Sequence, residues 1–121
     1  MQEIETPNYY SMHDIIGQQL SAVVFVMDYL RLMFNSDYMN VMGYPPVTVR
    51  GDAYHPGSSR YRDVLCEIIT HIVVRAEARK GDAVEIVFDD DSSIYIPVRD
   101  EDYLYGPELV VYEAGSHWWF L

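Results

Sequence analysis

Residues 83–98 read AVEIVFDDDSSIYIPV, and this stretch decides the fold. Apolar side chains alternate with other residues on both sides of a short acidic run, a period of two that is typical of β-strands. The apolar rows are Val84, Ile86 and Phe88, then Ile94, Ile96 and Val98. The polar run between them favours a turn. The stretch therefore predicts an antiparallel hairpin with one buried face.

A similar pattern occurs 54 residues earlier, where residues 30–37 read LRLMFNSD. Its apolar row is Leu30, Leu32 and Phe34, and the polar residues that follow again favour a turn. Each copy is flanked by further alternating runs, so each predicts a three-strand meander. This similarity between the two segments can come from a duplication, or only from the alternation and polar turns that every hairpin needs. We refer to it below as the sequence echo.

One helix is predicted between the two meanders, starting at Ser58 or Ser59 and ending near Thr70 or His71. Its apolar face consists of Tyr61, Val64, Leu65, Ile68 and Ile69. Residues 43–59 are rich in proline and glycine, which predicts a long loop with room for a short strand at 47–49. Residues 109–112 and 117–120 predict a closing hairpin.

The strand after the helix is predicted over residues 72–79. Its inward residues are expected to be Ile72, Val74, Ala76 and Ala78, and its outward residues Val73, Arg75, Glu77 and Arg79. The whole pattern predicts an α+β fold, a curved and mostly antiparallel sheet of about seven or eight strands around one amphipathic helix. Three strands precede the helix and five follow it. Residues 1–121 are expected to form a single domain, with 1–14 as a loose N-terminal arm.

Composition narrows the class of protein. Half of the 121 residues are hydrophobic, which supports one real core and argues against intrinsic disorder. The single cysteine, Cys66, excludes a disulfide scaffold and fits a reducing compartment. The longest apolar run, 20–34, is too short to span a membrane and contains Asp28 and Arg31. The first 14 residues lack the basic start of a secretory signal, so a cytoplasmic location is predicted.

Acidic residues greatly outnumber basic residues in this chain. Eight basic against 19 acidic residues give a net charge of −11, which argues against nucleic-acid binding. Residues 81–121 hold ten of the acidic residues and only one basic residue, with tyrosine and tryptophan among them. Aromatic side chains anchor interfaces, and acidic charge steers basic partners. The contact segment predicted for a basic protein partner comprises Asp100, Glu101, Asp102, Tyr103 and Tyr105, together with Tyr95. The other interpretation is charge for solubility with the aromatic residues in the core.

No spacing in the sequence predicts catalytic, metal-binding or cofactor-binding residues. The run Asp89–Asp91 lacks the alternation and central glycine of a calcium loop, which leaves a solvated turn or a weak divalent-ion site. His13, His55, His71 and His117 show no metal-ligand spacing. Cys66 lies within the predicted helix, where a packed or half-buried thiol is expected rather than a nucleophile. An enzyme is therefore not predicted.

Three functions are compatible with these observations. The first is a non-enzymatic binding protein, for example an immunity or antitoxin-like protein that neutralises a basic toxin. The second is a self-associating module that forms a homodimer through the apolar C-terminal strand, residues 116–121. The third is a small-molecule pocket covered by residues 43–59.

Several short motifs occur together in the chain. They are DYLRLMF at 28–34, YRDVLC at 61–66, FDD at 88–90 and GPE at 106–108. Over residues 15–121 this combination resembles a group of small bacterial proteins of unknown function. The resemblance implies no activity and transfers no site residue.

Overall fold

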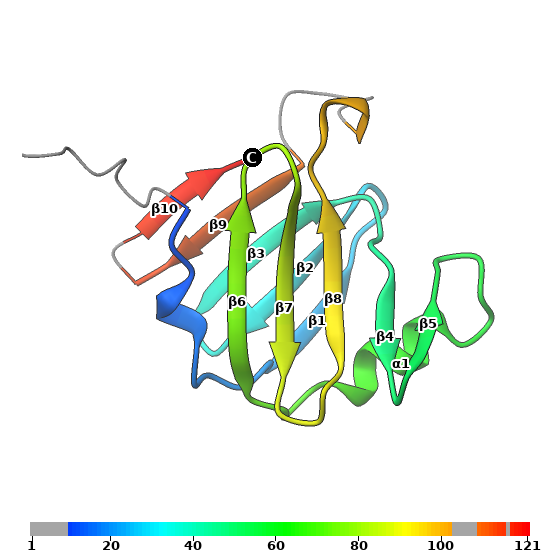
Figure 1. Ribbon diagram of the computed structural model, residues 1–121. Helices are drawn as coiled ribbons and strands as arrows, with labels where there is room; N and C mark the ends of the chain where they lie inside the picture. The colour runs from blue at the N-terminus through cyan, green and yellow to red at the C-terminus, as the bar shows by residue number, and fades with distance from the viewer. Residues whose placement is uncertain (1–9, 103–108, 116) are drawn as a thin grey trace, which may run out of the picture.

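The computed structural model describes residues 10–102, 109–115 and 117–121, which form two antiparallel five-stranded sheets (Figure 1). The first sheet has the order β1-β2-β3-β9-β10 and the second the order β5-β4-β8-β7-β6. The strands are β1 (Ala22–Phe25), β2 (Tyr29–Phe34), β3 (Asp37–Met42), β4 (Val47–Val49), β5 (Asp52–Tyr54), β6 (Val73–Arg79), β7 (Ala83–Phe88), β8 (Ser93–Pro97), β9 (Val110–Ala114) and β10 (His117–Phe120). The helical elements are η1 (His13–Ile15), α1 (Tyr61–Glu67) and η2 (Asp100–Asp102).

The core lies between the two sheets, which Figure 1 shows face to face with their strands crossing at an angle. The row Leu30, Leu32 and Phe34 on β2 and the row Val84, Ile86 and Phe88 on β7 are fully buried. Ile94, Ile96 and Val98 are buried as well. The inward rows predicted for these three strands are therefore confirmed.

The predicted fold class, α+β with one curved sheet around a helix, is wrong. The chain forms two sheets, and each provides most of the apolar cover that the other needs. Helix α1 has only seven residues and lies beside the sheets, in contact with β1 and β4. It buries Tyr61, Val64 and Leu65 against them.

The connections exchange strands between the sheets. The meander β1-β2-β3 belongs to the first sheet and the meander β6-β7-β8 to the second. Hairpin β4–β5 follows the first meander but pairs with β8, whereas hairpin β9–β10 follows the second and pairs with β3. Both copies of the sequence echo are thus the central strand of a meander, one in each sheet. The segment 43–59 was predicted as a long loop with room for a short strand at 47–49; that strand is β4, and it forms a hairpin with β5.

Two local predictions differ from the structure. Helix α1 begins after Arg60, without a side-chain cap, and ends at Glu67. Further helix is blocked at Thr70, whose φ of 86° is left-handed. In β6 a bulge lies between Val73 and Arg75, so Val73 is buried while Val74 is 52% exposed. The inward placement predicted for Ile72 and Val74 is wrong because the bulge adds one residue and shifts the alternation.

The segment before β1 closes the edge between the sheets. Leu20 N–H donates to the His71 carbonyl at 3.0 Å, and Trp119 Nε1 donates to the Ser11 carbonyl at 3.0 Å. His117 Nδ1 lies 2.8 Å from Asp14 Oδ2. Residues 11–14 of the predicted loose arm are therefore held against the sheets, and 1–9 lie outside the described residues.

No helix in the described part of the chain is long and apolar enough to cross a membrane.

Candidate interaction surfaces

Part of the predicted acidic contact segment follows β8. Tyr95 is on the outer face of β8, and Glu101 and Asp102 belong to η2. Arg99 N donates to Asp102 Oδ2 at 2.8 Å and Arg99 Nε donates to the same oxygen at 3.1 Å, which lowers the pKa of the Asp102 carboxyl. Glu101 is held less closely, with Oε2 3.9 Å from Arg99 Nε and its side chain 73% exposed. The side chain of Asp100 and all of Tyr103 and Tyr105 lie outside the described part.

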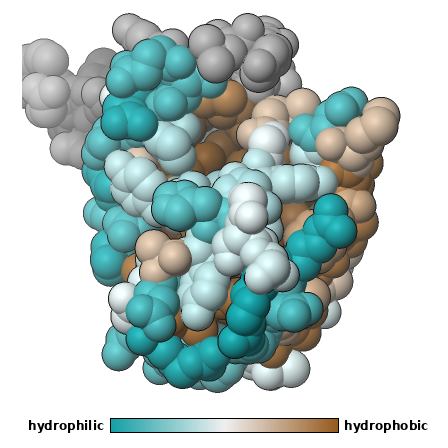
Figure 2. Space-filling view, turned by 90° about the vertical axis from the view of Figure 1, so that its right-hand side faces the viewer, coloured by the Kyte–Doolittle hydropathy of each residue, from teal (hydrophilic) through white to brown (hydrophobic). Residues whose placement is uncertain are grey.

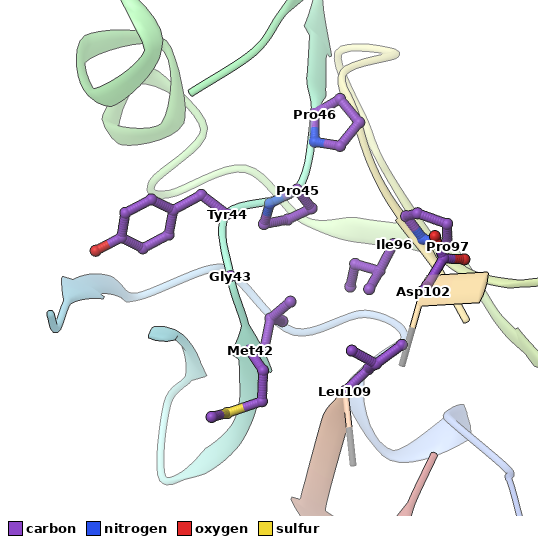
Figure 3. A pocket seen from close by; sticks show the side chains of 10 residues that line it. Met42, Gly43, Tyr44, Pro45, Pro46, Ile96, Pro97, Asp102 and Leu109 are labelled. Atoms are coloured by element: carbon purple, nitrogen blue, oxygen red, sulfur yellow. The ribbon is translucent and has the colours of Figure 1, made fainter. Parts of the chain in front are cut away.

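A cleft of about 240 Å³ adjoins this segment (Figure 3). It lies between the β3–β4 connection and the end of β8. Its lining residues are Val41, Met42, Gly43, Tyr44, Pro45, Pro46, Ile96, Pro97, Asp102 and Leu109. Asp102 is the one charged side chain among them. Figure 3 shows the Tyr44 ring turned away from Ile96 and Leu109, and Tyr44 Oη donates to the Val26 carbonyl at 2.5 Å. The side chains that line the cleft are therefore mostly apolar, with Asp102 as the one carboxylate.

The acidic residues of the last third are divided between regions of the molecule. Asp82 lies at the η2 end, where Val98 N–H donates to its carbonyl at 2.8 Å. Asp89–Asp91 form the β7–β8 turn at the opposite end of β8 (Figure 1). Glu113 is on β9, in the other sheet. Acidic side chains therefore lie in several regions of the molecule, and those at the η2 end adjoin the cleft.

His71 brings the acidic β7–β8 turn together. Its Nδ1 lies 2.8 Å from Asp89 Oδ1 and its Nε2 lies 3.5 Å from Asp90 Oδ2. Burial would raise the pKa of the Asp90 carboxyl, but hydrogen bonds from the Ser92 hydroxyl and N–H, with the nearby His71, lower it overall. Among the described residues this is the one group of three side chains placed to share a metal ion. Hydrogen bonds and pairing within the turn already account for its geometry.

The outer face of the first sheet is unexpectedly apolar. One row across it is Ala22, Met33, Tyr38, Glu113 and Trp118, and the next is Val24, Arg31, Asn40, Val111 and Phe120. Trp118 is 61% exposed and Phe120 is 43% exposed, and their rings meet edge to face at 5.7 Å. The sequence signal was the apolar character of the C-terminal segment, but only the fold shows which of its residues point outward.

The outer face of the second sheet differs in character. Arg79 pairs with Glu77 and Asp82, each at 2.8 Å, and Arg75 lies 3.3 Å from Glu77. In Figure 2 the right-hand margin, where the first sheet lies, is mostly hydrophobic, whereas the left-hand margin is mostly hydrophilic. The two sheets thus present an apolar and a charged outer face.

The remaining sequence candidate is Cys66, which is exposed on α1 rather than packed.

Comparisons of the chain with protein-family models, with curated proteins and with solved structures found no match. The resemblance to small bacterial proteins therefore stays a prediction.

Proposed function

We propose that this chain is a non-enzymatic binding domain that captures a basic protein partner at its η2 end. The observation that carries the proposal is the apolar cleft with Asp102 at its rim and the exposed Glu101 beside it. An immunity or antitoxin-like role against a basic toxin in the cytoplasm is the concrete form of this proposal.

Long-range and short-range forces have separate parts in this binding. The net charge of −11 attracts a basic partner from any direction and raises the association rate. At contact, the apolar walls cover the aliphatic stem of an arginine or lysine, whose charged end reaches the rim. Arg99 holds Asp102 at 3.1 Å but Glu101 only at 3.9 Å, so Glu101 is the more available of these two carboxylates for the incoming cation.

A charge-matched pair of variants tests the site. Glu101→Gln with Asp102→Asn removes two charges beside the cleft, and Asp89→Asn with Asp91→Asn removes two at the opposite end of β8. A basic partner is first identified by cross-linking in the source cell, and association rates are then measured over a salt series. We expect the first double variant to associate roughly tenfold more slowly and with a shallower salt dependence than the control variant. Equal slowing in both variants would show general steering without a site at the η2 end.

A further inference from the structure

We propose that the outer face of the first sheet is a symmetric interface with a second copy of this chain. The surface differs from the η2 end, so the inference is independent of the proposed function. It begins from exposed aromatic side chains. Trp118 and Phe120 project from β10 beside Val111 of β9, and Val24 and Met42 on the same sheet are each about two-fifths exposed. A cluster of exposed and half-buried apolar side chains such as Trp118, Phe120 and Val111 is typical of an interaction site.

The distribution of charge favours a second copy of this chain as the partner that binds the outer face of the first sheet. Two copies that both carry −11 repel each other over most of their surfaces. The two rows across this sheet carry one basic residue, Arg31, and one acidic residue, Glu113, so the face has no net charge there. Copies can therefore approach through this face without like-charge repulsion across the contact.

The two charges are also arranged for two-fold symmetry. Arg31 is on β2 and Glu113 is on β9, the strands on either side of β3. A two-fold axis along β3 places β2 of one copy over β9 of the other. Arg31 then lies diagonally opposite Glu113 of the second copy, a separation that a long side chain spans. The pair forms twice, as an isologous interface requires.

Tyr38, at the centre of the face, holds both charged groups in place. The Arg31 guanidinium lies 4.2 Å from the centre of the Tyr38 ring, and Arg31 Nε donates to Asn40 Oδ1 at 2.8 Å. Tyr38 Oη donates to Glu113 Oε1 at 2.6 Å. Both side chains are thus ordered before the copies meet, which reduces the entropy lost on association.

The size of the face sets the expected strength. Five strands spaced about 4.8 Å apart, with five residues at about 3.4 Å each, give a face of roughly 24 Å by 17 Å. This is about half of the roughly 800 Å² per partner in a standard interface. We therefore expect a reversible monomer–dimer equilibrium rather than a permanent dimer.

Charge reversal with mixing tests the inference on the full chain by sedimentation equilibrium. Arg31→Glu places two acidic groups on the face and Glu113→Arg places two basic groups there. We expect each variant alone to dimerise about tenfold more weakly than the unmodified chain. An equimolar mixture should restore association, because each copy then faces the opposite charges. Arg75→Glu, an equal reversal on the outer face of the second sheet, is the control and should leave dimerisation unchanged.

Circular dichroism melting of each variant separates lost association from lost folding, and a Trp118→Ser variant provides a second route to the same face. The inference is overturned if the unmodified chain stays monomeric at every concentration. It is also overturned if well-folded Arg31→Glu and Trp118→Ser variants dimerise like the unmodified chain, or if the mixture associates no better than its components.

Discussion

At the scale of residues, the β7–β8 turn is held by one buried hydroxyl. Ser92 is fully buried, and its hydroxyl donates to Asp90 Oδ1, which also accepts the Ser92 N–H at 3.0 Å. Where the acidic run alone suggested a solvated turn or a weak ion site, the structure gives Asp90 a structural contact. A buried donor that loses its acceptor is costly, so Asp90 is the residue of the run whose replacement matters most.

Replacement of Asp90 should reveal this contact. Asp90→Ala is expected to lower the free energy of unfolding by about 2 kcal/mol, because the Ser92 hydroxyl loses its acceptor. Asp90→Asn keeps an acceptor and should cost less. Since the folded pKa of Asp90 is lowered, the advantage of the original carboxylate over asparagine is present at neutral pH. It should disappear as the pH falls through that lowered pKa. Urea denaturation over a pH series measures it, and a gap independent of pH would contradict the assignment.

At the scale of elements, strands with regular alternation were predicted well. Strands interrupted by prolines, glycines or a bulge were predicted less well. The rows on β2, β7 and β8 are as predicted, since a strand with one buried face shows its period directly. The short strand predicted at 47–49 is β4, whereas its partner β5 was missed because the surrounding prolines and glycines resemble a loop. Its turn uses Arg50 and Gly51 with φ values of 53° and 83°, the left-handed pair that a two-residue hairpin turn requires.

The bulge in β6 makes the neighbouring valines a matched pair for mutation. Val73→Ala removes buried methyl groups and should cost about 2 kcal/mol of unfolding free energy. Val74→Ala changes an exposed side chain and should stay within about 0.5 kcal/mol of the original chain. Chemical denaturation of both variants measures the difference. If Val74→Ala instead cost more than Val73→Ala, Val74 would be the buried residue. The result would contradict the bulge and support the alternation expected from the sequence.

At the scale of the whole molecule, the exchanged hairpins join the two halves into one folding unit. Each meander is completed by the hairpin of the other half, through the pairings β3–β9 and β4–β8. The buried rows of both halves also form a single core. Neither half can therefore bury its apolar strands alone.

Fragments provide the test of this interdependence. We expect residues 1–70 and 71–121, prepared separately, to lack cooperative unfolding, because each loses both its facing sheet and a paired hairpin. Mixed together, they should regain strand content by circular dichroism and a single unfolding transition. A cooperative transition in either fragment alone would contradict the interdependence of the halves.

The sequence by itself determined most of the strands, the buried rows of β2, β7 and β8, the similarity of residues 30–37 to 84–91 and the excess of acidic charge, because alternation and composition are local properties of a chain. It could also name Tyr95, Glu101 and Asp102 as candidates for contact. Only the tertiary structure decided that the meanders form two sheets, that Asp102 lies at the rim of a cleft, and that Trp118 faces outward. These features depend on which strands pair across long separations, and the pairing is fixed by the mutual burial of two apolar faces, which no local pattern encodes.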